Sequence, residues 1–243
     1  KLRMAIRMVY VDPTTAQQVA QDAVAAGVIT DNADNAEMKV EETRAAMVFN
    51  GWSDHRIGAD LLCYMNGYQD PRREKMFTQV EITETVGGKP TKVSGFAGIR
   101  IGIDVVNKES VIDRYSKPII STASPYPWMN AAEITFLRAE GALRGWAMGG
   151  DAKSLYKEAI ALSFEQYGLP ATDALSYAAN ASNTPQAYTD PVDGTYSAGA
   201  VSNLTVAWQE GDEYAEKNLE RIITQKWIAM FPSTVEAWSE YRR

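Results

Sequence analysis

The sequence predicts a mainly α-helical fold, an irregular stack of tetratricopeptide-like helical hairpins decorated with loops and small strands. Apolar residues recur at helical spacing in three pairs of segments, at the start, in the middle and at the end of the chain. Short connections join the members of each pair, and small residues would let the helices approach closely: Ala16, Ala20, Ala139, Ala142 and Ala159. Because the pairs are unevenly spaced and do not match residue by residue, we expect a decorated stack instead of a regular repeat array.

Local signals predict where the helices begin. Side chains that cap helix N-termini stand before four apolar-periodic segments: Asp12 (followed by Pro13), Asp54, Asn130 and Asp151. Asn130 and Glu133 form a capping-box pattern, in which Glu133 caps back, and residues 232–236 repeat that pattern near the end. We expect the helix after Asp54 to reach about Asn66, and the helix after Asn130 to run to Gly149-Gly150.

The remaining segments predict loops and small strands. Residues 31–50 indicate a loop that leads to an extended piece near 45–49. Residues 78–106 indicate strands or irregular structure, with a hairpin-type turn at 87–90. Residues 124–128 indicate a stiff connector, because each proline restricts the residue before it. Residues 172–205 form a long polar segment, which favours a functional or mobile loop.

Length and charge narrow the class of protein. A chain of 243 residues can form one domain with a sizeable core, and we expect a single helical domain over 1–243. The net charge of −7 argues against nucleic acids and anionic membrane surfaces as partners. The one cysteine, Cys63, lies in an apolar stretch and is expected to be buried.

No pattern of residues indicates catalysis, a cofactor or a metal. The chain has one histidine, His55, which argues against histidine-based metal clusters and triads. Glu133 and Glu140 would lie about 10 Å apart along one helix, beyond the roughly 5–9.5 Å of glycosidase carboxylate pairs. We therefore expect Glu133 to cap its helix and Glu140 to pair with an arginine.

Aromatic residues in predicted loops are the best candidates for ligand contact. The flat C–H faces of sugars stack on aromatic rings, while their hydroxyls need polar partners. Seven residues meet that description and are the candidate ligand-binding residues: Trp52, Tyr68, Tyr126, Trp128, Asn183, Tyr188 and Tyr196. Three other tryptophans lie on predicted helix faces and are expected in the core: Trp146, Trp227 and Trp238.

Four segments, in order along the chain, resemble the SusD/RagB family. The chain opens on LRMAIRM (2–8), which resembles the family's first conserved helix, and continues with DHRI (54–57) and NGYQDPR (66–72). The stretches AEITFLRAEGALRGW (132–146) and IITQKWIAMF (222–231) with EAWSEYRR (236–243) match later family motifs. His55 departs from the tyrosine usual at its position. The order and length of these matches identify the chain as resembling the carboxy-terminal portion of a SusD-like protein.

This resemblance implies both a fold and a role. Such proteins are non-enzymatic, lipid-anchored nutrient-binding proteins at the cell surface of Bacteroidetes, which capture glycans for a TonB-dependent, SusC-like transporter. The lipid anchor would lie in an amino-terminal segment that is not in this chain. The alternatives are a protein-interaction scaffold with helical repeats and no small-molecule ligand, and a glycosidase that uses Glu133.

Overall fold

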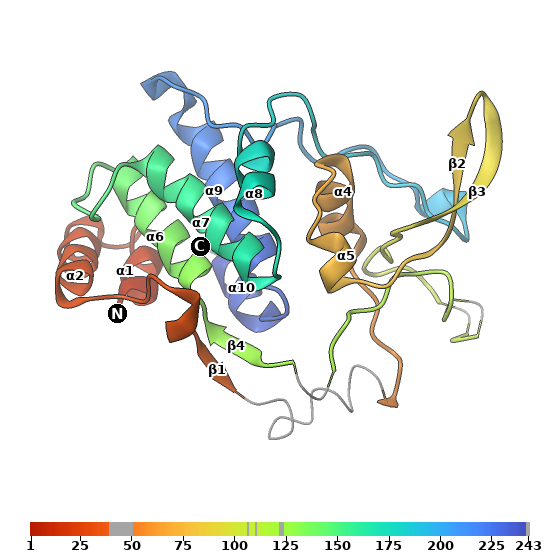
Figure 1. Ribbon diagram of the computed structural model, residues 1–243, viewed down its shortest axis with the longest axis horizontal. Coiled ribbons are helices and arrows are strands. Elements are labelled where there is room, and N and C mark those ends of the chain that lie inside the picture. The colour runs from red at the N-terminus through yellow and green to blue at the C-terminus, as the bar shows by residue number, and fades with distance from the viewer. Residues whose placement is uncertain (39–50, 106, 110, 122–123, 242–243) are drawn as a thin grey trace. The chain divides into compact units, whose positions relative to one another are not determined.

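The computed structural model describes residues 1–38, 51–105, 107–109, 111–121 and 124–241. They fall into two compact units, each built from distant parts of the chain (Figure 1). The helical unit comprises Lys1–Met38, Pro125–Asn180 and Ala207–Arg243. The loop unit comprises Lys39–Ser124 and Ala181–Val206. The expectation of one domain over 1–243 stays a prediction. So does the extended piece near 45–49, which lies outside the described residues.

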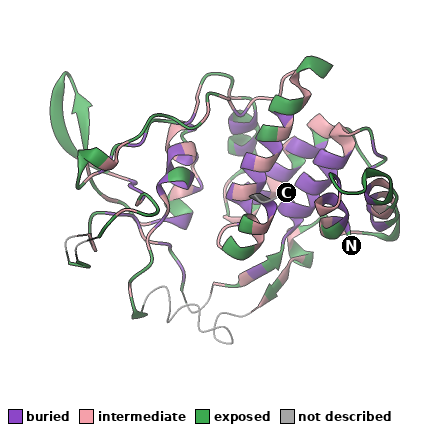
Figure 2. Ribbon diagram, turned by 180° about the vertical axis from the view of Figure 1, so that it is seen from behind, coloured by how far each residue is buried: buried purple, intermediate pink, exposed green. Residues whose placement is uncertain are grey.

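Helical hairpins make up the helical unit. Its helices are α1 (Leu2–Arg7), α2 (Pro13–Ala26), α6 (Ala131–Leu143), α7 (Ala152–Gln166), α8 (Ala171–Ala178), α9 (Ala215–Ala229) and α10 (Thr234–Tyr241). Helix α6 packs against α1, α7 and α9, so every residue from Ala131 to Gly141 is buried (Figure 2). The prediction of a mainly α-helical stack is confirmed.

Three predicted caps begin their helices as expected. The Asp12 carboxylate accepts a hydrogen bond from the Thr15 amide at 3.0 Å, and Asp151 accepts one from Ser154 at 2.9 Å. Asn130 accepts one from the Glu133 amide at 2.7 Å. These contacts involve neighbours in sequence, so local pattern was enough to predict them.

Two predictions about helix length were wrong. Helix α6 ends at Leu143, because Gly145 turns the chain at a φ of +82° and the Trp146 amide then donates to the Gly141 carbonyl. Trp146 is buried as expected, although it lies beyond the helix. Within the long loop predicted at 172–205, Ala171–Ala178 forms helix α8, which buries Ala174, Tyr177 and Ala178. Trp238 was expected in the core and is 60% exposed on α10.

Parts of the loop predicted at 31–50 and of the connector predicted at 124–128 form a small sheet instead. Strand β1 (Ala36–Met38) pairs antiparallel with β4 (Tyr126–Met129), with Met38 opposite Tyr126. Proline is compatible with β4 because, in the described part of the chain, this strand pairs with β1 alone. The Asn35 side chain then accepts a hydrogen bond from the Ala131 amide at 2.7 Å, which ties the sheet to the start of α6.

The loop unit contains short elements. Helices α4 (Ala59–Gly67) and α5 (Arg73–Met76) precede a hairpin of β2 (Val80–Val86) and β3 (Lys89–Gly95). Gly87 and Gly88, with φ of +59° and +81°, make its two-residue turn, as the sequence predicts. The short 3-10 turn Gly194–Tyr196 lies in the second segment of this unit.

Helix α4 begins later than predicted. Its N-cap is Gly58, and residues 54–57 are not helical. Asp54 pairs with Lys108 at 2.5 Å, so it does not cap the helix. Cys63 is buried in α4 as expected, and this burial raises the pKa of its thiol to about 11.

Candidate ligand-binding site

A pocket of about 290 Å³ lies in the loop unit, next in sequence to an exposed tryptophan. Its lining residues come from segments far apart in the chain: Ser53, Asp54, Arg56, Ile99, Val105, Lys108 and Val111. Trp52, which directly precedes this lining, is 57% exposed. The pocket therefore combines apolar walls with three charged groups, and Trp52 is joined to it through its carbonyl, which Lys108 binds.

Hydrogen bonds fix the charged groups of the pocket. The Lys108 ammonium donates to the Trp52 carbonyl at 2.7 Å and pairs with Asp54 Oδ1 at 2.5 Å. The hydrogen bond from Lys108 holds the pKa of Asp54 below its usual value, so the carboxylate is ionised at neutral pH. The Arg56 guanidinium donates to the carbonyls of Ser53 at 2.9 Å, His55 at 2.8 Å and Ile112 at 3.1 Å.

Backbone strain coincides with this pocket. Ser53 has a φ of +52°, a left-handed conformation that residues with a Cβ seldom adopt. The hydrogen bonds of Arg56 to Ser53 and of Lys108 to Trp52 hold the backbone on both sides of the strained position. Strained conformations of this kind concentrate at functional sites, which makes this segment a candidate for ligand contact.

Two predicted ligand-binding tyrosines are buried. Tyr68 is 4% exposed, and its hydroxyl donates to the Leu204 carbonyl at 3.1 Å. Tyr188 is 8% exposed, and its hydroxyl oxygen lies 2.6 Å from Asp190 Oδ2 and 2.8 Å from the Gly98 carbonyl. Both rings pack inside the loop unit in this structure.

Asp190 organises the loop that contains Tyr188. Its carboxylate also accepts hydrogen bonds from the Tyr115 hydroxyl at 3.1 Å and from the amides of Val192 and Asp193 at 2.8 and 2.9 Å. Burial alone would raise the pKa of Asp190, but these hydrogen bonds outweigh it and lower the pKa. Burial, together with the Asp190 charge, raises the pKa of both tyrosines above its ordinary value.

The other predicted residues are at least partly accessible. Trp128 on β4 is 59% exposed, while Tyr126, Asn183 and Tyr196 are half-buried. Tyr126 and Trp128 belong to the helical unit, whereas Asn183 and Tyr196 belong to the loop unit together with Trp52. The Tyr196 carbonyl accepts a hydrogen bond from Arg100 at 2.9 Å. The side-chain Nδ2 of Asn183 donates to the Tyr68 carbonyl at 3.5 Å.

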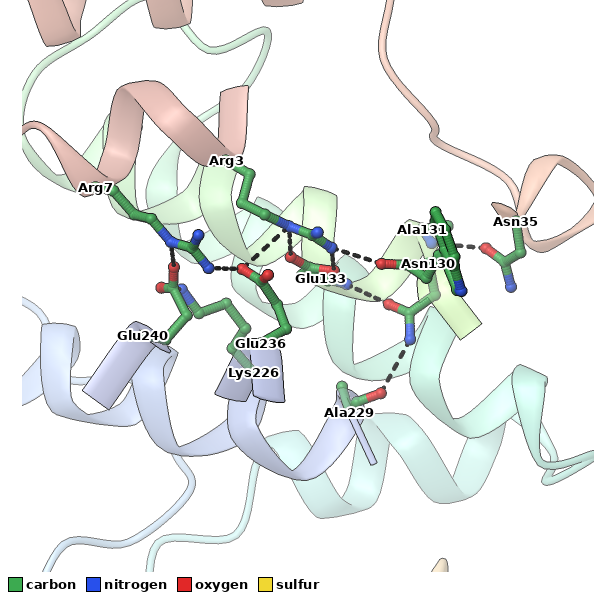
Figure 3. Close-up of polar contacts among 11 residues, drawn as sticks. Arg3, Arg7, Asn35, Asn130, Ala131, Glu133, Lys226, Ala229, Glu236 and Glu240 are labelled. Atoms are coloured by element: carbon green, nitrogen blue, oxygen red, sulfur yellow. Dashed lines mark hydrogen bonds and ion pairs between the residues drawn. The ribbon is translucent and has the colours of Figure 1, made fainter. Parts of the chain in front are cut away.

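The acidic residues of the helical motifs form ion pairs. Arg3 on α1 reaches Glu133 on α6 through two hydrogen bonds, of 2.7 and 2.6 Å, as Figure 3 shows. Among the residues that the structure describes, the Glu133 carboxylate accepts hydrogen bonds from Arg3 and makes no capping hydrogen bond, contrary to the capping-box prediction. Glu140 pairs with Arg144 at 2.9 Å, as expected.

A second set of ion pairs joins the end of the chain to its start. Arg7 pairs with Glu236 and, at 3.3 Å, with Glu240 on α10 (Figure 3). Lys226 on α9 pairs with Glu240 in a site where both side chains are at most 5% exposed. Lys226, within the IITQKWIAMF stretch, therefore acts as an ion-pair partner that joins α9 to α10.

Residues of the NGYQDPR stretch also support the fold. Asp70 and Arg72 form a fully buried ion pair at 2.6 Å. The Asn66 side chain donates to the Phe96 carbonyl at 2.9 Å and accepts from Arg73 at 2.8 Å. Most segments that carry the resemblance therefore build the scaffold. The exception is DHRI (54–57), which supplies Asp54 and Arg56 to the pocket, while the other lining residues lie outside these segments.

The part of the chain that the structure describes contains neither a membrane-spanning helix nor a metal-binding cluster. In those residues no helix is both long and apolar enough to cross a membrane. The same residues contain no group of three or more histidine, cysteine or acidic side chains placed to hold a metal ion.

A family model described as SusD-like, SusD and RagB outer membrane lipoprotein, matches residues 1–243. The chain belongs to the SusD-like family. Its members include a SusD homologue from Bacteroides thetaiotaomicron, which is 49% identical with a TM-score of 0.90. That match covers 100% of this chain and 49% of the homologue.

Two further SusD homologues have similar structures. A chitin-binding homologue from Flavobacterium johnsoniae is 40% identical with a TM-score of 0.86, covering 100% of this chain and 48% of the homologue. A homologue from Bacteroides ovatus is 42% identical with a TM-score of 0.83, covering 100% and 50%. The chain thus spans about half the length of these SusD-like relatives. A comparison with curated proteins gave no match.

Proposed function

We propose that this chain is the glycan-binding part of a non-enzymatic SusD-like protein, which captures its ligand at the outer membrane for a TonB-dependent transporter. The observation that carries the proposal is a pocket of about 290 Å³ next to an exposed tryptophan in a member of this family. A homologue that is 40% identical is described as chitin-binding, which supports a glycan as the ligand class.

Trp52 is the residue through which the ligand would stack. Its side chain is 57% exposed, while its carbonyl is held by Lys108 at the pocket wall. A tryptophan side chain has only two dihedral angles to order, so it loses little conformational freedom when a sugar stacks on it, and the polar groups of the pocket can bond the sugar's hydroxyls. Tyr196 and Asn183 stay candidates for contacts within the same unit, and Trp128 for a separate contact on the helical unit.

Replacement of Trp52 tests this assignment. We expect Trp52→Ala to weaken binding of the preferred glycan by about tenfold, since aromatic contacts contribute about 0.5–1.5 kcal/mol beyond the area that they bury. Isothermal titration calorimetry would first identify that glycan in a panel that includes N-acetylchitohexaose, maltohexaose and cellohexaose, and would then compare the variants.

Trp238→Ala is the matched control, because Trp238 is 60% exposed and lies on α10 of the helical unit. It should leave affinity unchanged. Equal loss of affinity in both variants would count against Trp52 as the stacking residue. Absence of binding to any glycan in the panel would overturn the proposed ligand class and favour a protein-interaction scaffold.

The non-enzymatic role is supported by the contacts of the acidic motif residues. Glu133 and Glu140 are each engaged by an arginine, and seven residues along a helix separate them by about 10 Å. Turnover of a bound oligosaccharide that disappears in Glu133→Gln would contradict this part of the proposal.

The transporter and the location rest on the family alone. Affinity purification of the full-length protein from outer membranes of its own host should recover a TonB-dependent transporter. Protease treatment of intact cells should remove the protein if it lies at the cell surface. Failure of both measurements would contradict the proposed partnership while leaving the glycan assignment to be judged by calorimetry.

A further inference from the structure

We infer that the pocket beside Trp52 selects uncharged glycans and discriminates against anionic ones. The inference rests on the proposed function, since it names the class of glycan that the same pocket would take. It is drawn from how the two cations of the pocket, Arg56 and Lys108, are already engaged by Asp54 and by backbone carbonyls.

Lys108 is the first cation that an acidic sugar could use, and it is already neutralised. Its ammonium lies 2.5 Å from Asp54 Oδ1 and donates to the Trp52 carbonyl at 2.7 Å. A carboxylate or sulfate that approached Lys108 would meet the Asp54 charge at the same place. Because like charges repel, an anionic group would gain little from Lys108 while Asp54 lies beside it.

Arg56 is the second cation, and backbone carbonyls use its donors. Its Nε and Nη2 both donate to the Ile112 carbonyl, and its Nη1 donates to the carbonyls of Ser53 and His55. Four of the five N–H groups of a guanidinium are thereby engaged, so no parallel pair of donors is left for a bidentate clamp on an anion. The charge of nearby Asp113 further offsets that of Arg56.

The groups that remain suit hydroxyls. Within the described residues, Asp54 Oδ2 makes no hydrogen bond, and the Lys108 ammonium uses two of its three N–H groups. A sugar hydroxyl both donates and accepts, so it can bond the Asp54 oxygen and the Lys108 hydrogen without disturbing their ion pair. Ile99, Val105 and Val111 provide apolar wall for the C–H face of the sugar.

The volume limits how much of the glycan enters. About 290 Å³ lies at the lower end of the roughly 300–1,000 Å³ typical of small-molecule pockets. The pocket therefore takes a short part of an oligosaccharide, and its charge balance acts on that part. Discrimination should depend on a charge in the segment that enters the pocket.

The experiment compares the affinity of the protein for neutral and for anionic hexasaccharides. Calorimetry would use N-acetylchitohexaose, maltohexaose and cellohexaose as neutral probes, and hexagalacturonate and a hyaluronan hexasaccharide as anionic probes. We expect at least one neutral probe to bind, with every anionic probe at least about tenfold weaker. Raising the salt concentration from roughly 50 to 300 mM, which shortens the screening length, should leave the neutral affinity unchanged.

Asp54→Asn is the decisive variant, because it leaves Lys108 as an unbalanced cation. We expect neutral affinity to fall about 3- to 10-fold, the range for loss of one hydrogen bond, while anionic affinity rises. Lys108→Gln should weaken neutral binding by a similar factor without any gain for anionic probes. Glu81→Gln is the matched control, since Glu81 pairs with Lys92 at 2.7 Å on the hairpin, outside the pocket lining, and should change neither affinity.

The outcomes separate the two proposals. Binding of an anionic probe as tightly as the best neutral one would overturn the selectivity and leave the glycan function standing. An unchanged ratio of anionic to neutral affinity in Asp54→Asn, with an unfolding curve like that of wild type, would also overturn it. If Asp54→Asn does not fold, Lys108→Gln decides, because a gain in anionic affinity there contradicts the inference. Absence of binding to every probe overturns the proposed function and the inference together.

Discussion

Individual charged residues of the helical unit form ion pairs that link helices distant in sequence. Arg3 and Glu133 are 130 positions apart, yet their side chains form two parallel hydrogen bonds, of 2.7 and 2.6 Å. The Glu133 side chain is 4% exposed and that of Arg3 is 19% exposed. Removal of the arginine would leave a buried carboxylate without its cation, which costs more than loss of an exposed pair.

We therefore expect Arg3→Ala to lower the free energy of unfolding by about 2–4 kcal/mol, because it leaves that carboxylate buried and uncompensated. Urea denaturation followed by circular dichroism measures this quantity. Lys92→Ala is the control: its pair with Glu81 is more than 60% exposed on both sides, so the change should stay within about 0.5 kcal/mol. Equal changes in the free energy of unfolding for the two variants would show that the Arg3–Glu133 ion pair does not stabilise the fold.

Close backbone approach positions the elements of the loop unit. The Ala59 amide at the start of α4 donates to the Ile99 carbonyl at 2.8 Å, and the Ile99 amide donates to the Ile57 carbonyl at 2.8 Å. A Cβ on Gly98 would lie 2.6 Å from the Ala59 Cα and 2.8 Å from the Gly58 carbonyl oxygen. This contact between backbones leaves no flexible side chain that could move away.

Gly98→Ala should consequently destabilise the loop unit by about 1–3 kcal/mol, the usual cost of overpacking. Hydrogen exchange of the α4 amides, read by mass spectrometry, would report faster opening. Gly194→Ala serves as the matched control, since a Cβ there meets nothing within 4 Å and the position has no positive φ. Faster α4 exchange in the control as well would contradict the packing argument.

The elements also show what the sequence alone could predict. Caps such as Asp12 and Asn130 act over three residues, so local pattern predicted them. The β1–β4 pairing joins segments about 90 residues apart, and no periodicity within either segment encodes the partner. Helix α8 was missed because Thr172, Asp173 and Ser176 fit a loop composition, although its three alanines favour a helix.

Some residues of the candidate site could likewise be predicted from the sequence, and others could not. Trp52 was predicted from its residue type and its place in a loop. Lys108 and Asp54 were not predicted as a site, because the pocket exists only when two segments more than 50 residues apart meet. Asp54 was instead expected to cap α4, since an acidic residue before an apolar segment gives the same local signal for either role. Predicted binding residues such as Tyr68 and Tyr188 are buried, and residue type alone could not separate them from Trp52.

For the molecule as a whole, the shifted pKa values predict where stability depends on pH. Every aspartate with a resolved shift has a lowered pKa: Asp12, Asp54, Asp151, Asp190 and Asp193. A carboxyl whose pKa is lower in the folded state contributes stability above its unfolded pKa of about 3.9, and this is lost as pH falls through the folded value. Tyr115, Tyr188 and Cys63 have raised pKa values, so their contributions are lost as pH rises through those values.

Asp190→Asn tests the acidic side of this dependence at its most buried contributor. At neutral pH we expect the variant to be less stable by about 1–3 kcal/mol, because an amide cannot accept from two tyrosines and two backbone amides as the carboxylate does. Protonation of Asp190 in the wild type removes the same stabilisation, because a protonated carboxyl also accepts fewer hydrogen bonds than the carboxylate. The difference in unfolding free energy between wild type and variant should therefore shrink as pH falls from about 7 to about 3, measured by urea denaturation at each pH. A difference of the same size at both pH values would contradict the assignment of acid sensitivity to Asp190, because a purely steric effect of the amide would not depend on proton binding.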